Sequence, residues 1–299
     1  MRIGYYPGCS LLGSSREFDE SVRALAKAID LELVEVPDWN CCGASSAHVL
    51  DHKLSLSLPA RILAKAEAAG LTEVLAPCAA CYNRLTSARA ELQADPAAAA
   101  EVAAIIEMPV TGQVKVINVL ELLDRCQDAL KAKLVAPFAH KVACYYGCLL
   151  VRPPKVVAFD RPENPQSMDR LMAAAGAQPI EWNFKTECCG AAFSVTRTDL
   201  VAKMSGKIVA DAVRHGAEAI VVACPMCQSN LDMRRPEINA YLGAQPGAKA
   251  QDRLGGDSTV PVIFITQALG LALGIAPAEL GLQRHMVPAL ALQSASTPV

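Results

Sequence analysis

The arrangement of the cysteines limits what this chain can be more than any other feature. The chain has 299 residues and 12 cysteines, and ten of these follow one pattern that occurs twice. The pattern is a lone cysteine, then two adjacent cysteines followed by glycine, then Cys-x-x-Cys. The first cysteine set is Cys9, Cys41, Cys42, Cys78 and Cys81, and the second is Cys148, Cys188, Cys189, Cys224 and Cys227. The intervals from the lone cysteine to the pair are 32 and 40 residues, and those from the pair to Cys-x-x-Cys are 36 and 35. Such self-similarity indicates a duplicated unit, and we predict two domains, 1–133 and 134–299.

Between the cysteines, short apolar runs alternate with segments of helical periodicity. The expected strands are 1–6, 32–36, 73–77, 141–148, 180–184 and 219–224, and the expected helices are 16–31, 56–70, 166–177 and 201–216. The most apolar window, 260–277, contains Thr266 and Gln267 and is too short for a membrane span, so we expect a buried helix there. Alternating strands and helices favour an α/β fold, here two pseudo-symmetric domains built from parallel βαβ units.

Each group of cysteines follows an expected strand and precedes an expected helix. In a parallel sheet these loops meet at the carboxyl edge, where α/β folds bind ligands. We therefore expect the five thiols of each half to converge, although they are spread over about 70 residues of sequence. Nearby helix N-termini would favour the thiolate form.

Composition and charge narrow the class of protein. The net charge is −2 and there is no long basic run, which argues against nucleic acid as the main partner. The first residues lack the charged and apolar regions of a secretory signal. We expect a cytoplasmic protein whose thiols stay reduced, and such thiols serve metal ligation or redox chemistry.

Three kinds of site could use such thiols. Structural zinc takes four ligands, commonly from two Cys-x-x-Cys pairs, whereas each half here has one pair and five thiols. A thioredoxin-like dithiol would use only the Cys-x-x-Cys. An iron–sulfur cluster is held by thiolates, usually four, and a fifth could bridge irons or stay free beside the cluster. Adjacent thiolates such as Cys41 and Cys42 cannot easily chelate one iron but can reach two irons of one cluster.

The double pattern resembles the CCG-domain family, and within it the B-subunit family of CoB–CoM heterodisulfide reductase, including bacterial homologues of the sulfur-oxidation type. The segments "YYGCLLVRPP", "FDRPENPQSMDRLMAAAGA", "ECCGAA" and "QALGLALGIAPAELGLQRHMVP" carry this resemblance, which covers almost the whole chain. It implies two non-cubane [4Fe–4S] clusters near the domain interface, one on each cysteine set. It also implies reductive cleavage of a disulfide held between them, with each cluster supplying one electron and capturing one sulfur. The implied partners are a C-type subunit with ferredoxin-like iron–sulfur clusters and a flavin-containing A-type subunit.

The sequence departs from the methanogen-type relatives beside the second lone cysteine. Tyr145 and Leu149 stand around Cys148, where those proteins are expected to carry a histidine. The substrate is therefore either the heterodisulfide or another disulfide, thiol or persulfide, for example a lipoate-like thiol, and both directions of reaction stay open. The alternatives to a catalytic role are an electron-relay protein without a substrate and a zinc-stapled interaction module. A catalyst needs a cavity that reaches both clusters, whereas a relay does not.

A few further residues have two interpretations each. His48, near His52, is a candidate proton donor to a departing thiolate, or else a solvated or capping histidine. Cys126 and Cys144 are expected to be structural thiols, with a supporting ligand role as the alternative for Cys144.

Charged and aromatic residues also flank the sets. Arg152, Lys155 and Lys185 could hold an anionic substrate group, although exposed charge is the default expectation. The tyrosines before the lone cysteines are expected to pack over the clusters, or to donate a hydrogen bond to sulfur; they are Tyr5, Tyr6, Tyr145 and Tyr146.

Overall fold

A computed structural model describes residues 2–44, 46–244 and 260–292, and these contain two four-stranded, entirely parallel sheets. The first sheet has the order β2-β1-β3-β4, with β1 Arg2–Tyr5, β2 Glu32–Glu35, β3 Glu73–Leu75 and β4 Lys115–Ile117. The second has the order β6-β5-β7-β8, with β5 Lys141–Tyr145, β6 Gln178–Pro179, β7 Ala219–Val222 and β8 Val262–Phe264. The matching strand order confirms the predicted α/β fold with two pseudo-symmetric halves.

Several helices of the first half begin at side chains that satisfy their free N–H groups. The helices are α1 Gly8–Leu12, α2 Arg16–Ala28, α3 Ala47–Leu50, α4 His52–Ala68, α5 Ala79–Ala94, α6 Pro96–Ile106, α7 Val119–Arg125 and α8 Gln127–Ala132. Helix α4 starts four residues before the predicted helix because the Asp51 carboxylate accepts a hydrogen bond from the Leu54 amide at 2.7 Å. Asn118 and Glu121 form a capping box at the start of α7.

The second half differs from expectation in two segments. Its helical elements are α9 Ser167–Ala174, η1 Ala191–Phe193, α10 Thr198–Arg214, α11 Pro225–Gln228, the π-helix η2 Ser229–Met233, α12 Arg235–Gly243, α13 Ile265–Ala272, η3 Leu282–Arg284 and η4 Leu290–Leu292. The strand predicted at 180–184 is instead β6, at Gln178–Pro179, where proline has no N–H for the ladder. Only part of the window 260–277 is helical, because β8 first pairs with β7 before α13 begins.

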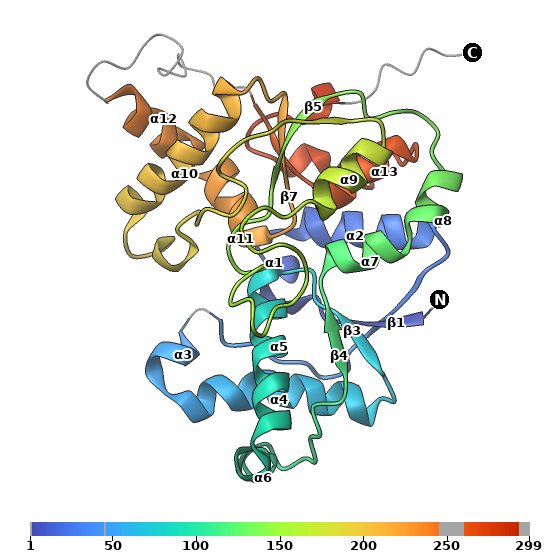
Figure 1. Ribbon diagram of the computed structural model, residues 1–299, viewed down its shortest axis with the longest axis vertical. Helices are drawn as coiled ribbons and strands as arrows, with labels where there is room; N and C mark the ends of the chain where they lie inside the picture. Colours follow the sequence, from blue (N-terminus) through green and yellow to red (C-terminus); the bar gives the residue numbers. More distant parts are fainter. Residues whose placement is uncertain (1, 45, 245–259, 293–299) are drawn as a thin grey trace.

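The two halves pack through helices related by the internal symmetry. Helix α2 of the first half packs against α13 of the second, and the equivalent pair, α9 and α7, packs in the same way. Figure 1 shows α2, in blue, beside these second-half helices rather than at the outer surface. The Phe18 and Phe264 rings stack at 4.0 Å, and the Ser21 and Thr266 hydroxyls lie 2.7 Å apart. This contact fixes how the two sets of cysteine loops face each other.

Candidate metal centre

Every group of cysteines lies at the carboxyl end of a strand, as the repeat predicts. Cys9 lies in α1 directly after β1, the Cys41–Cys42 pair follows β2, and Cys78 is the N-cap of α5 after β3. The second set occupies the same positions: Cys148 after β5, the Cys188–Cys189 pair after β6, and Cys224 at the N-cap of α11 after β7.

The five thiols of the first set contact one another in series. The sulfurs of Cys9 and Cys41 lie 3.8 Å apart, and those of Cys42 and Cys81 lie 3.2 Å apart. Cys41 also lowers the pKa of Cys42, and Cys78 contributes to the raised pKa of Cys81, so these neighbouring sulfurs lie near each other. Cys9 and Cys41 are exposed and the other three are buried, so this set has a solvent-facing end and a buried end.

The second set repeats these contacts and meets the first. Cys188 raises the pKa of Cys148, and Cys189 and Cys224 raise that of Cys227, so these sulfurs lie near one another. The neighbouring Cys224 raises the pKa of Cys78, and both of these residues are buried. The two cysteine sets therefore come close to each other at the first cysteine of each Cys-x-x-Cys, at the junction of the halves.

The thiol contacts favour the thiolate at particular sulfurs. Hydrogen bonds from Cys41 and Cys81 lower the pKa of Cys42 to about 3, and the bond from Cys148 lowers the pKa of Cys188 to about 6. A thiolate is the form that binds metal. Each adjacent pair thus includes one sulfur that is prepared to act as a ligand.

The glycine after each cysteine pair shapes the loop around sulfur. Gly43 and Gly190 have φ values of 75° and 85°, in the left-handed region that favours glycine. This turn directs the Gly43 amide to the Cys41 sulfur at 3.5 Å and the Gly190 amide to the Cys188 sulfur at 3.3 Å.

Replacing Gly43 with alanine is expected to destabilise the protein more than the same change at Gly70. Both positions have a positive φ, which costs roughly 1–2 kcal/mol for alanine. At Gly43 a new Cβ would also lie 2.8 Å from the Ala47 Cβ and from Leu58, whereas nothing lies within 4 Å at Gly70. Overpacking adds about 1–3 kcal/mol. Denaturant unfolding of the two variants measures the difference, and equal losses would contradict the packing argument.

Two buried tyrosines hold the loops before the cysteine pairs, one in each half. The Tyr6 hydroxyl donates to the Asn40 carbonyl at 2.9 Å, and the Tyr145 hydroxyl donates to the Glu187 carbonyl at 2.6 Å. Each acceptor directly precedes a cysteine pair. Both hydroxyls therefore bind a backbone carbonyl rather than sulfur. Because Pro7 stands between the tyrosine pair and the Gly-Cys of the first half, Tyr6, the second tyrosine there, is equivalent to Tyr145, the first tyrosine of the second half.

Two asparagines position the cysteine loops and were not singled out from the sequence. Asn230 donates to the Cys189 carbonyl at 3.2 Å and approaches the Cys189 sulfur at 3.6 Å. Asn83 donates to the Leu149 and Arg152 carbonyls, at 3.1 and 2.7 Å, and so joins α5 of the first half to the loop after Cys148. Asn83 lies two residues after Cys81 and Asn230 three residues after Cys227. This similar spacing in the two halves is the sequence pattern that could have identified them.

Lys185 is buried, which corrects the expectation that it is exposed. The residue is 3 % exposed, and its ammonium group lies 2.8 Å from Asp169. The Tyr146 hydroxyl donates to the other Asp169 oxygen at 2.6 Å. The carboxylate offsets the cost of burying the charge, so Lys185 fixes the loop before Cys188. Arg152 pairs with Glu163 at the surface, and Lys155 is exposed.

The remaining candidates lie apart from these contacts. His48 is exposed on α3, and His52 pairs with Glu91 at 2.8 Å. Cys144 is fully buried in β5, where burial raises the pKa of its thiol. Cys126 is half-buried between α7 and α8, and burial raises its pKa as well. The packing role predicted for Cys144 fits its place in the core, while a role of His48 as proton donor stays a prediction.

The donors of these two sets suit a cofactor that is bound by thiolates alone. Among the described residues, no three His, Cys, Asp or Glu side chains are arranged to hold a single metal ion. The five sulfurs of each half instead lie in a series, and no nitrogen or oxygen ligand lies among them. Iron–sulfur clusters are bound by sets of Cys thiolates, and the chemistry of the donors fits such a group.

Comparisons with known proteins identify the family of this chain. The family model of the cysteine-rich domain named CCG matches residues 3–86 and 142–232, once in each half. The 8-methylmenaquinol:fumarate reductase membrane anchor subunit of Wolinella succinogenes is 34% identical over 97% of this chain and 98% of its own length. The B subunit of the ferredoxin/F(420)H(2)-dependent CoB–CoM heterodisulfide reductase of Methanosarcina acetivorans is 27% identical, covering 96% of this chain and 94% of its own.

The fold also matches a solved structure. A hypothetical protein from Helicobacter pylori superposes with a TM-score of 0.76 at 12% identity over 96% of this chain, which spans only about half, 52%, of that protein. Within the ranges that the structure describes, no helix is long and apolar enough to cross a membrane. With a cysteine-rich domain matched in each half and B-subunit relatives aligned along nearly its whole length, the chain belongs to the CCG cysteine-rich family that includes the B subunits of heterodisulfide reductases.

Proposed function

We propose that this protein is the catalytic iron–sulfur component of a heterodisulfide reductase-like complex. The observation that carries the proposal is the closeness of two equivalent five-thiol sets at Cys78 and Cys224, where Cys224 raises the pKa of Cys78. Two redox groups bound there would be close enough to act on one substrate. Relatives named as B subunits of heterodisulfide reductases support an oxidoreductase-type role, and their cysteine-rich domain supports an iron–sulfur role.

The ten cysteines of the two sets would hold two [4Fe–4S] clusters of non-cubane type, one in each half. When bound, such clusters supply single electrons, and two of them together supply the pair that a disulfide requires. In the reductive direction the balance is one disulfide, two electrons and two protons giving two thiols. Gly43 and Gly190 hold the loops that would contact the clusters, while Tyr6 and Tyr145 fix the backbone before each cysteine pair.

The partners and the setting follow from the same proposal. Electrons would come from a ferredoxin-type iron–sulfur protein resembling the C-type subunit, supplied in turn by a flavin-containing protein resembling the A-type subunit. The substrate would be a disulfide, a thiol or a persulfide, with a lipoate-like thiol as one candidate. A cytoplasmic location, where free thiols are maintained, completes the proposal.

An electron-relay protein without its own substrate is the second candidate. It is favoured by one observation: a cavity of about 350 Å³ lies between the halves, yet none of its lining residues is a cysteine. In the relay, electrons would pass between the two cysteine sets and leave the protein.

Turnover with an artificial redox dye separates these two functions. The anaerobically purified protein is mixed with a reduced viologen and a small disulfide, or with an oxidised dye and the corresponding thiol. A catalytic component is expected to consume dye in proportion to the disulfide or thiol converted, in at least one direction. If the dye exchanges electrons with the protein but no disulfide or thiol is converted, the relay is the correct assignment.

A further inference from the structure

Asn230 contacts both the sulfur and the backbone of one cysteine in the second adjacent pair. Its amide nitrogen donates to the Cys189 carbonyl at 3.2 Å and to the Cys189 sulfur at 3.6 Å. Its amide oxygen accepts a hydrogen bond from the Ser194 hydroxyl at 2.9 Å. Asn230 is 2 % exposed, so water does not compete for these contacts. The Cys189 sulfur therefore has a side-chain N–H donor beside it in a buried site.

The orientation of the Asn230 amide is fixed by its neighbours. The Cys189 carbonyl oxygen can only accept a hydrogen bond, so the amide atom 3.2 Å from it must be the nitrogen. A turned amide would place two acceptors against each other there, and it would also lose the donor to the sulfur. The nitrogen therefore faces Cys189, while the oxygen faces the Ser194 hydroxyl.

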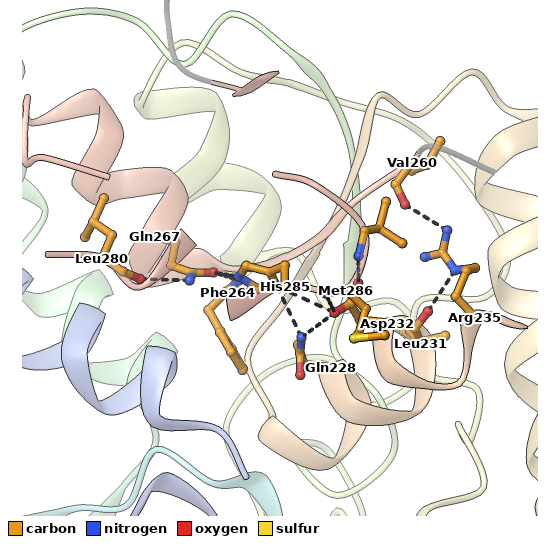
Figure 2. A network of polar contacts seen from close by, with 11 residues as sticks. Gln228, Leu231, Asp232, Arg235, Val260, Phe264, Gln267, Leu280, His285 and Met286 are labelled. Carbon is orange, nitrogen blue, oxygen red and sulfur yellow. Dashed lines mark hydrogen bonds and ion pairs between the residues drawn. The ribbon is translucent and has the colours of Figure 1, made fainter. Parts of the chain in front are cut away.

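The π-helix that carries Asn230 is held in place by a buried network. On the same helix, η2, the Asp232 carboxylate accepts hydrogen bonds from the Met286 and Val287 amides at 2.8 and 3.0 Å. The Gln228 amide nitrogen donates to the same carboxylate at 3.1 Å. Figure 2 shows the Asp232 carboxylate directed at Gln228 and Met286. These contacts fix η2, and with it the position of Asn230 beside the cysteine.

The first half has no equivalent of this donor. The Cys42 sulfur lies 3.2 Å from the Cys81 sulfur, and no side-chain amide or hydroxyl in the described part of the chain donates to it. The residue three positions after Cys81 is Arg84, which lies in the regular α-helix α5, whereas Asn230 lies in a π-helix. Such turns are rare and are frequent at functional sites. The two cysteine sets thus repeat the same thiols but differ in the donors around them.

A hydrogen bond to sulfur favours the reduced state of an iron–sulfur centre. Reduction adds negative charge to the thiolate-bound group, and a donor stabilises that charge. Hydrogen bonds to the sulfurs are one of the factors that set the reduction potentials of such clusters. Cys189 is buried, and a hydrogen bond is electrostatically stronger there than in water. The donor on η2 therefore acts on one half of the protein only.

We propose that Asn230 is a positioning residue that raises the reduction potential of the iron–sulfur centre of the second half through its hydrogen bond to the Cys189 sulfur. The inference rests on the proposed function, because it concerns the clusters that this function requires. It makes the two centres unequal although their thiolates follow the same pattern. The second-half centre is easier to reduce than the same five thiolates alone would make it.

A redox titration of the anaerobically purified protein, followed by electron paramagnetic resonance, tests this role. Asn230→Leu removes the donor and keeps a similar side-chain volume, while the Cys189 carbonyl retains the Ser205 hydroxyl at 3.0 Å. One of the two midpoint potentials should become more negative, and the other should not change. At the wild-type midpoint, the ratio of reduced to oxidised centre should fall by about 2- to 10-fold, the range that corresponds to loss of one hydrogen bond.

Ser205→Ala is the matched control, because it removes a hydrogen bond to the same Cys189 carbonyl and leaves the sulfur contact in place. Its two midpoint potentials should equal those of the wild type. Asn230→Ala carries the same prediction as Asn230→Leu if the larger side chain lowers the iron content. Unchanged potentials in the Asn230 variants, an equal shift in Ser205→Ala, or loss of iron from both Asn230 variants would overturn the inference.

Dye-linked turnover of the wild type keeps this inference apart from the proposed function. A selective shift in Asn230→Leu without conversion of any disulfide or thiol would refute the catalytic function and retain the role of Asn230. Conversion by a protein whose potentials do not depend on Asn230 would do the reverse. A wild type without iron–sulfur signals would overturn both.

Discussion

Replacing Cys42 with alanine is expected to remove the metal of the first half and leave that of the second. The Cys42 sulfur contacts those of Cys41 and Cys81, and these bonds lower its pKa toward the thiolate that a metal requires. Cys189→Ala should have the mirror-image effect. Each variant should retain about half of the iron of the wild type, since each cluster depends on its own thiolates, and should lose dye-linked turnover.

Iron quantification and the electron paramagnetic resonance spectrum of each variant measure this effect. Cys126→Ala is the matched control, because Cys126 is half-buried between α7 and α8 and belongs to neither set. An unchanged spectrum in both Cys42→Ala and Cys189→Ala would show that the adjacent cysteines are not ligands.

Replacing Asp169 with asparagine is expected to cause a large loss of stability. The carboxylate pairs with the buried Lys185 ammonium at 2.8 Å and accepts a hydrogen bond from Tyr146 at 2.6 Å. The variant would leave a buried charge without a partner, which costs about 3–5 kcal/mol. The loop from Lys185 to Cys188 should loosen, so the second half should also lose metal more readily than the first.

Denaturant unfolding of the Asp169→Asn variant measures this loss against a surface control. Asp199→Asn removes an exposed ion pair with Arg197 at 2.7 Å, which should cost less than about 1 kcal/mol. Equal losses in the two variants would mean that the Lys185 pair contributes no more than an exposed one.

The cysteine repeat was sufficient to predict the fold and the convergence of the two sets. Periodicity located the strands β1, β2, β3, β5 and β7 and the helices α2, α4, α9 and α10, whereas β4 and most of the shorter helices were not predicted. It failed where tertiary contacts decide the structure: β8 is a strand because it pairs with β7, and Pro179 ends β6 early. The domain boundary near residue 133 stays a prediction.

Residues that act through backbone groups could not be found from spacing alone. Asn83 reaches across the interface to the Leu149 and Arg152 carbonyls, a contact that depends on how the halves pack. Burial of Lys185 depends in the same way on Asp169, which approaches it from α9. Neither side chain has a local pattern that distinguishes it from a solvated residue.

The most direct test is the metal content of the intact protein purified without oxygen. Iron, acid-labile sulfide and zinc are quantified per chain, and Mössbauer spectroscopy assigns the iron sites. We expect about eight iron atoms and eight sulfides, from one four-iron cluster in each half, with no stoichiometric zinc. Zinc in stoichiometric amount without sulfide would contradict it and would identify the protein as a zinc-stapled interaction module.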